Sequence, residues 1–309
     1  MLAGNRLYAR VTGGFLLLES ARRLWLACRS GLLAAWCALT AVAAAGDAGA
    51  SSGPLSEEVP FIVTPDNVTL EMLRIANVGA GDHVIDLGSG DGRIVINAAR
   101  RFGATGLGVD IDPALVELSQ RSAITAGVAD KVRFQVQDLF QTDLSRATVI
   151  TMYLLPSFNL SLRPSLLNLK PGTRVVSHDW DMGDWEPDHT SLVSAPDKAV
   201  GRDKQSQVHL WVVPAQVQGV WCGSGALASY VLTLQQRYQQ VQGTLQRRER
   251  SWPISGRLQG AVLSTQDTEA GQLELRHQGT QLALTGGRGP IALARGASFS
   301  AARDGRCGG

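Results

Sequence analysis

The chain has 309 residues, 44% of them hydrophobic, and a net charge of +2 at neutral pH. This length allows one large or two modest domains, with enough apolar surface for a core. The charge is uneven, because residues 1–45 carry five arginines and one glutamate and the remainder has a net charge of −2. A mildly acidic body lacks the basic surface that nucleic-acid binding requires, so no nucleic-acid partner is expected.

The N-terminal segment has the composition of a targeting sequence. Basic residues precede an apolar stretch over residues 31–45, and small residues follow that stretch. This pattern predicts a signal peptide or membrane anchor over residues 1–45, and a protein of the cell envelope that is either membrane-anchored or exported. A mis-annotated start is the alternative, and it would leave the protein in the cytoplasm. Residues 46–58, rich in Ala, Gly, Ser and Asp, predict a flexible linker.

Residues 59–214 form the next predicted domain, which begins with the extended sequence Val-Pro-Phe-Ile-Val-Thr-Pro. Thr64 and Pro65 are suited to start a helix, with Thr64 as its N-cap. The free N–H groups and the hydroxyl at such a helix start could receive a carboxylate of a bound cofactor. A plain N-cap without a ligand is the alternative for Thr64.

A short apolar strand runs into a glycine-rich turn over residues 84–92. Three glycines at alternate positions let the backbone bend tightly and let a ligand approach with no Cβ in the way. One acid precedes the first glycine by two residues, where it would repel a pyrophosphate and favour a cationic ligand. An ordinary strand-to-helix turn is the alternative. The candidate binding residues of this turn are Asp86, Gly88, Ser89, Gly90 and Gly92.

Two further predicted strands also end in an acid. The second ends at Asp110, 24 residues after Asp86, and the third ends at Asp138. A carboxylate has two acceptor oxygens, so Asp110 is suited to bind both hydroxyls of a ribose. Asp112 then caps a helix. Because the carboxyl ends of parallel strands meet at one edge of a sheet, the three acids are expected to line one ligand site.

The glycine turn resembles motif I of the class I S-adenosylmethionine-dependent methyltransferases. The resemblance implies an α/β fold, a Rossmann-like sheet with helices on both faces. It also implies S-adenosylmethionine as the methyl donor. In this resemblance Asp138 accepts a hydrogen bond from the adenine amino group, while Ile111 and Leu139 cover the faces of the adenine ring.

A narrower resemblance covers residues 58–190. The lead-in, the glycine turn, Asp-Leu-Phe at 138–140 and the segment around 149–157 are similar to bacterial methyltransferase-domain proteins. These are related to the mitochondrial protein-lysine methyltransferases of the adenine nucleotide translocase and the ATP synthase c subunit. The resemblance implies a protein-lysine N-methyltransferase. Two alternatives remain open: a small-molecule O- or N-methyltransferase, and a non-catalytic S-adenosylmethionine-binding protein of the envelope.

The predicted fourth and fifth strands, over residues 148–155 and 174–178, carry the candidates for catalysis. Tyr153 could orient an amine through its hydroxyl, and His178 and Asp179 are further candidates for a base. A buried core residue is the alternative for Tyr153. The loop after Asp179 is rich in acids, but the fourth strand supplies no carboxylate, so no metal site is predicted.

Residues 207–214 alternate and predict an antiparallel strand that closes the sheet, with His209 exposed on it. Six short alternating runs follow, which predict a small all-β accessory domain over residues 215–293, as an antiparallel sandwich or partial barrel. Residues 294–309, rich in Ala, Gly, Arg and Ser, predict a disordered tail. Export would permit a disulfide between Cys222 and Cys307.

Overall fold

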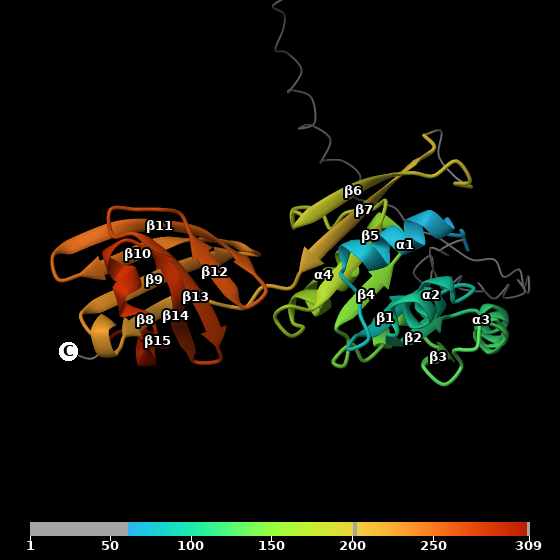
Figure 1. Cartoon of the computed structure of the whole chain (residues 1–309), viewed down its shortest axis with the longest axis horizontal. Coiled ribbons are helices and arrows are strands. Elements are labelled where there is room, and N and C mark those ends of the chain that lie inside the picture. The colour runs from blue at the N-terminus through green and yellow to red at the C-terminus, as the bar shows by residue number, and fades with distance from the viewer. Residues whose placement is uncertain (1–60, 200–202, 308–309) are drawn as a thin grey trace, which may run out of the picture. The chain divides into compact units, whose positions relative to one another are not determined.

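The computed structural model describes residues 61–199 and 203–307 of the chain (Figure 1). The predicted targeting segment and linker lie outside these residues. Six strands that run in the same direction and one antiparallel strand, β7, form a single sheet in the order β3-β2-β1-β4-β5-β7-β6. The strands are β1 (His83–Leu87), β2 (Thr105–Asp110), β3 (Val132–Val136), β4 (Val149–Met152), β5 (Arg174–His178), β6 (His189–Ser194) and β7 (Gln205–Val212).

Helices cover both faces of this sheet. In β1, Val84 packs with Met72 on one face, while its neighbour Ile85 packs with Leu162 on the other. Side chains alternate between the faces of a strand, so each face receives its own apolar cluster. This arrangement confirms the predicted Rossmann-like methyltransferase fold. The helices are α1 (Asp66–Ile75), α2 (Arg93–Phe102), α3 (Pro113–Thr125) and α4 (Pro156–Leu167), and none of the described helices is long and apolar enough to cross a membrane.

Three details of the sheet differ from the sequence prediction. Strand β4 ends at Met152, so Tyr153 lies just beyond it. Strand β7 does not close the sheet, because β6 pairs with its outer side. The alternating pattern of β6 is weak, since most of its side chains are exposed or only partly buried. His209 was predicted to be exposed but is buried, with Nδ1 2.9 Å from the Thr190 hydroxyl of β6.

The chain continues into a closed antiparallel barrel of eight strands. Figure 1 shows these strands in orange to red. Leucines of successive strands fill the interior, so the barrel holds a packed core. The sequence prediction named six of the strands and missed β12 and β15. The strands are β8 (Gly219–Gly223), β9 (Tyr230–Arg237), β10 (Gln240–Arg247), β11 (Arg250–Gln259), β12 (Val262–Thr265), β13 (Gln272–Gln278), β14 (Gln281–Arg288) and β15 (Ser298–Ala301).

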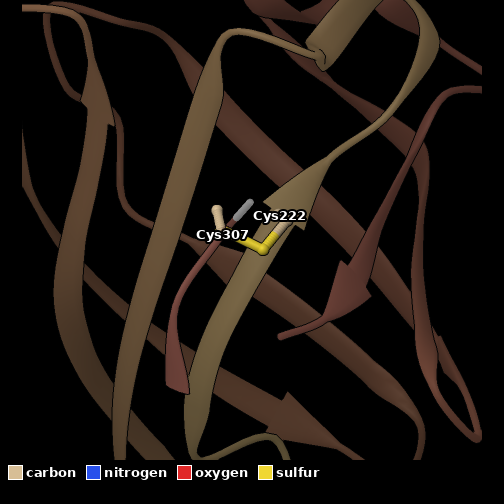
Figure 2. Close-up of a disulfide and its surroundings, with 2 residues drawn as sticks. All are labelled: Cys222 and Cys307. Carbon is tan, nitrogen blue, oxygen red and sulfur yellow. A yellow bond between two sulfur atoms is a disulfide. The ribbon is translucent and has the colours of Figure 1, made fainter. Parts of the chain in front are cut away.

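The prediction of a disordered tail over residues 294–309 is wrong for residues 294–307, which the structure describes. Strand β15 closes the barrel by pairing with β14 and β8, and Phe299 at its centre is fully buried. Cys307, beyond the strand, forms a disulfide with Cys222 of β8 (Figure 2). This segment is ordered because residues 298–301 supply the last strand of a closed sheet, and the small-residue composition concealed that role.

Candidate functional site

The glycine turn after β1 has a backbone that only glycine adopts readily. Gly88, Gly90 and Gly92 have φ angles of 75°, 53° and 78°, all in the left-handed region. A Cβ on Gly90 would lie 2.3 Å from the ring of Phe61, and one on Gly92 would lie 2.7 Å from the ring of Phe134. The turn therefore presents bare backbone, held between two aromatic rings, at the carboxyl edge of the sheet.

Asp86 lies directly below this turn and is buried. Its Oδ1 accepts a hydrogen bond of 2.7 Å from the hydroxyl of Thr151 on β4. The pKa of Asp86 is raised to about 7, chiefly by burial and to a smaller degree by the nearby Asp110 and Asp91, against the lowering effect of the Thr151 hydroxyl. A buried carboxyl group of this kind favours a positively charged neighbour, which would lower its pKa again.

Ser89 within the turn has an unsatisfied hydroxyl. Its Oγ is buried and has no hydrogen-bond partner among the described residues. A Cβ built on Gly108 of β2 would lie only 2.7 Å from this oxygen, so β2 leaves room for it because residue 108 is a glycine. A buried hydroxyl without a partner is uncommon, and here it lies on the side of the turn that packs against β2.

Asp110, at the end of β2, supports the turn and remains available to a ligand. Its Oδ2 accepts a hydrogen bond of 2.8 Å from Gly90 N, and its Oδ1 accepts one of 3.0 Å from Asp112 N. Each carboxylate oxygen can accept a second hydrogen bond. The next residue, Ile111, is 76% exposed, so an apolar side chain stands open beside the acid.

Asp138 follows β3 and caps the short helix η1 (Leu139–Gln141). It accepts hydrogen bonds of 2.9 Å from Phe140 N and 3.3 Å from Gln141 Nε2. Leu139 is partly buried against the apolar cluster below. The glycine turn at residues 88–92, the acids at the strand ends and the exposed Ile111 together form what we call the cofactor cradle. This cradle fits S-adenosylmethionine, which has a cationic methionine part, a ribose and a flat adenine.

Thr64 does not cap α1. The N-cap of this helix is Pro65, with no side-chain hydrogen bond. The Thr64 hydroxyl is buried and lies 3.3 Å from Nδ1 of His178, while its carbonyl oxygen accepts a hydrogen bond of 2.9 Å from Arg93. The prediction of Thr64 as an N-cap is therefore wrong, because its hydroxyl is directed at β5 and not at the helix start.

The three residues predicted for catalysis lie together where β4 and β5 end. The rings of Tyr153 and His178 have centroids 3.9 Å apart, and the Tyr153 hydroxyl donates to Asp179 Oδ2 at 3.4 Å. Nε2 of His178 lies 2.8 Å from the hydroxyl of Ser206 on β7. Hydroxyl groups contact both ring nitrogens of His178, so we do not favour its predicted role as a base. Its ring packs against the ring of Tyr153 and supports that side chain.

The protonation states in this cluster follow from burial. Burial lowers the pKa of His178 to about 4, with Asp179 raising it and Lys198 lowering it, so the imidazole is neutral at pH 7. Burial beside the Asp179 carboxylate raises the pKa of Tyr153 to about 12, so its hydroxyl keeps its proton. Tyr153 therefore acts as a hydrogen-bond donor at neutral pH.

Asp179 follows β5 in a left-handed conformation, with φ of 64°. This conformation is unfavourable for a residue with a Cβ, and such strain concentrates at functional positions. Its Oδ1 accepts a hydrogen bond of 3.1 Å from Gln207 N, and its Oδ2 lies 2.7 Å from Nζ of Lys198. Neighbouring strands hold the carboxylate, because Gln207 belongs to β7 and Tyr153 follows β4.

Several residues of the site were not predicted from the sequence. Thr151 could have been found from the sequence, because it lies in a predicted buried strand. The structure pairs it with Asp86 on the neighbouring strand. Lys198, Ser206 and Phe61 had none, because their roles depend on contacts with residues far away in the chain.

Comparisons with known proteins agree with this geometry. The family model for the ANTKMT methyltransferase domain matches residues 86–189. A protein-lysine N-methyltransferase of Saccharolobus islandicus is 42% identical over 131 residues, which are 42% of this chain and 81% of that protein. A lysine N-methyltransferase of the ATP synthase c subunit, from Mus musculus, is 31% identical over 134 residues, 43% of this chain and 53% of that protein.

Among solved structures, an RNA methyltransferase from Salinibacter ruber in complex with S-adenosyl-L-homocysteine is 49% identical. It covers 50% of this chain and 96% of its own, with a TM-score of 0.46. The chain spans only about half the length of the mouse relative. The family match ends at residue 189, so the barrel lies outside it.

Proposed function

Because this chain belongs to the methyltransferase family of the ANTKMT domain and the protein-lysine N-methyltransferases, we propose that it methylates the side-chain nitrogen of lysine in a protein. S-adenosylmethionine is its methyl donor. The names of several relatives support a protein acceptor, since they are lysine N-methyltransferases of the ATP synthase c subunit or of the adenine nucleotide translocase.

One observation carries this proposal: a cofactor cradle and a polar cluster share one edge of the sheet. Asp86, Asp110 and Asp138 lie at the ends of β1, β2 and β3. Tyr153 and Asp179 lie at the ends of the next two strands, β4 and β5. A cofactor over the first three strands would place its methyl group toward β4, where these two polar side chains can receive an amine.

S-adenosylmethionine, when bound, supplies an electrophilic methyl group on a positively charged sulfur. The chain's own residues hold the two reactants close together, and such proximity accounts for much of the acceleration expected in a methyl transfer. A free lysine has a pKa near 10.4, so it arrives as an ammonium, and its nitrogen must release one proton, by way of the Asp179 carboxylate to solvent, before its lone pair can react. The carboxylate of Asp179 is the group of this cluster that can accept hydrogen bonds from the ammonium.

The test is to incubate the purified chain with S-adenosylmethionine carrying a tritiated methyl group, in a lysate of source cells that lack the gene. We expect label in protein, and mass spectrometry should locate it on lysine nitrogen. Label confined to molecules of low mass would replace the proposal with a small-molecule methyltransferase. Binding of the cofactor without any transfer would leave a non-catalytic binding protein.

The raised pKa of Asp86 predicts how cofactor affinity depends on pH. Below pH 7 the buried carboxyl carries a proton, which must leave before the group can face a cation. Affinity for S-adenosylmethionine should therefore rise roughly fivefold from pH 6 to pH 7 and about twofold more by pH 8, and level off above that. Calorimetric titrations across this range measure the slope. Asp86→Asn should remove it, and an unchanged slope in that variant would assign the titration to another group.

Removal of the Tyr153 hydroxyl should affect transfer and leave the cofactor site intact. Tyr153→Phe keeps the ring against His178 and loses the hydrogen bond to Asp179. One such bond to a charged group contributes about 1.5 kcal/mol, so kcat/KM for methyl transfer should fall roughly tenfold. The affinity for S-adenosylhomocysteine should not change. A loss of both transfer and cofactor affinity would mean that Tyr153 shapes the cofactor site instead.

We also propose that the protein works in the cell envelope, by a membrane anchor or after export. The Cys222–Cys307 disulfide supports this location, because such bonds persist in oxidising compartments. Fractionation of source cells, with thiol alkylation before lysis, tests the proposal. A fully alkylatable pair of cysteines in a cytoplasmic fraction would contradict it.

A further inference from the structure

Lys198 is an unusual residue in this chain. The chain has four lysines against 25 arginines. Lys131, Lys170 and Lys204 are exposed, whereas the side chain of Lys198 is only 11% exposed. Removing an ammonium group from water is costly unless acceptors replace the lost hydration. The surroundings of this one lysine therefore describe a site that accepts a lysine ammonium.

Two acceptors receive the ammonium of Lys198. Its Nζ lies 2.7 Å from Asp179 Oδ2 and 2.7 Å from the carbonyl oxygen of Gln205. The same carboxylate oxygen accepts the hydrogen bond of the Tyr153 hydroxyl at 3.4 Å. Charge-assisted hydrogen bonds of this kind are the strong ones in proteins. The ammonium thus lies beside the aromatic residue that follows β4, on the acceptor side of the cofactor cradle.

We propose that the carboxylate of Asp179, with the hydroxyl of Tyr153, is the binding site for the ammonium of the acceptor lysine. Lys198 occupies this site when no acceptor is bound. The inference rests on the proposed lysine methylation and names the residues that recognise the acceptor. The left-handed backbone at Asp179 and its two hydrogen bonds with the backbone of Gln207 hold the carboxylate in place whichever lysine is bound.

Competition with Lys198 lowers the apparent affinity for an acceptor. An acceptor binds only to the fraction of molecules in which the site is open, so its apparent dissociation constant is the intrinsic one divided by that fraction. If Lys198 occupies the site about 90% of the time, Lys198→Met should strengthen acceptor binding about tenfold. Asp179→Asn should weaken it, because the carboxylate that attracts the ammonium is gone.

The experiment uses n-butylammonium chloride as a probe for a lysine side chain. The full chain is labelled with 13C at the lysine ε carbons, and Lys198→Met assigns one of the four signals. In the presence of S-adenosylhomocysteine, the probe should move the Lys198 signal toward the position of the three exposed lysines. Sodium chloride at equal ionic strength should not move it. In Asp179→Asn this signal should start at the exposed position and stay there.

Two matched variants control for general effects. Lys170→Met removes an exposed lysine that does not contact Lys198, and Asp181→Asn removes an exposed carboxylate two residues beyond Asp179. Neither should change the response of the Lys198 signal to n-butylammonium. A Lys198 signal that stays unmoved at 100 mM probe would overturn the proposed site.

This test separates the site from the proposed activity, because displacement requires no turnover. If the chain methylates protein lysine but n-butylammonium does not displace Lys198, the proposed function holds and the proposed lysine-ammonium site is wrong. Displacement without any methyl transfer would leave a lysine-ammonium site in a protein that lacks the proposed activity.

Discussion

Asp110→Ala should lower the affinity for S-adenosylmethionine more than a hundredfold. The variant loses both acceptor oxygens proposed for the ribose and the hydrogen bond that holds Gly90 N at 2.8 Å. Hydrogen bonds to a charged group contribute about 1.5–3 kcal/mol each, so the loss of two is about 3 kcal/mol or more. Calorimetric titration with S-adenosylmethionine and S-adenosylhomocysteine measures the effect, and both ligands should be affected equally because both contain the ribose.

The matched control is Asp130→Ala, which removes an exposed carboxylate from the same sheet domain. Its affinity should stay within about twofold of the unchanged chain, since surface substitutions of this kind have small effects. Circular dichroism should show that both variants are folded. If Asp110→Ala binds within threefold of the unchanged chain, the ribose is held elsewhere, and the assignment of the cradle fails.

Loss of the Cys222–Cys307 disulfide should be the largest stability effect in the barrel. The bond joins residues 85 positions apart, so it closes a long loop of the unfolded chain. Loop-closure entropy for that length corresponds to about 4–5 kcal/mol. For a domain of the size of the barrel, this loss of stability lowers the midpoint of thermal unfolding by roughly 10–30 °C. Calorimetry of the Cys222→Ser, Cys307→Ser double variant against the oxidised chain measures it.

A reductant supplies the internal control for this prediction. It should lower the unfolding midpoint of the unchanged chain to near that of the double variant and should have no effect on the double variant itself. Equal midpoints for the oxidised chain and the double variant would show that native packing of β15 alone holds the C-terminal segment. In that case the burial of Phe299, at the centre of β15, would be the interaction that keeps this strand in the barrel.

Local patterns predicted most of the sheet. The strand and turn over residues 84–92, the cap at Asp112 and the strand at 174–178 were each readable within about ten residues. Such features depend on hydrophobic periodicity, glycine and capping chemistry, which act between near neighbours. The acids at the strand ends were predicted for the same reason, because parallel strands bring their carboxyl ends to one edge.

The sequence prediction missed strands that form only because a neighbouring strand offers them an unpaired edge. Strand β6 has no buried side chain, and β15 is short and rich in small residues, so neither has a strong pattern of its own. Each is a strand because a neighbour already presents an unpaired edge for it. His209 was misjudged for the same reason: a lone strand would expose it, whereas β6 supplies the Thr190 hydroxyl beside it.

The sequence by itself determined the fold class and the cofactor and predicted residues for the cofactor site, because short segments with demanding backbone and charge requirements carry that information. Only the tertiary structure decided how the acceptor side is built. Thr64, His178 and Ser206 meet there from three separate elements, and Lys198 reaches Asp179 across a gap of 19 residues. Contacts of this kind are set by the packing of whole elements, which no local pattern encodes.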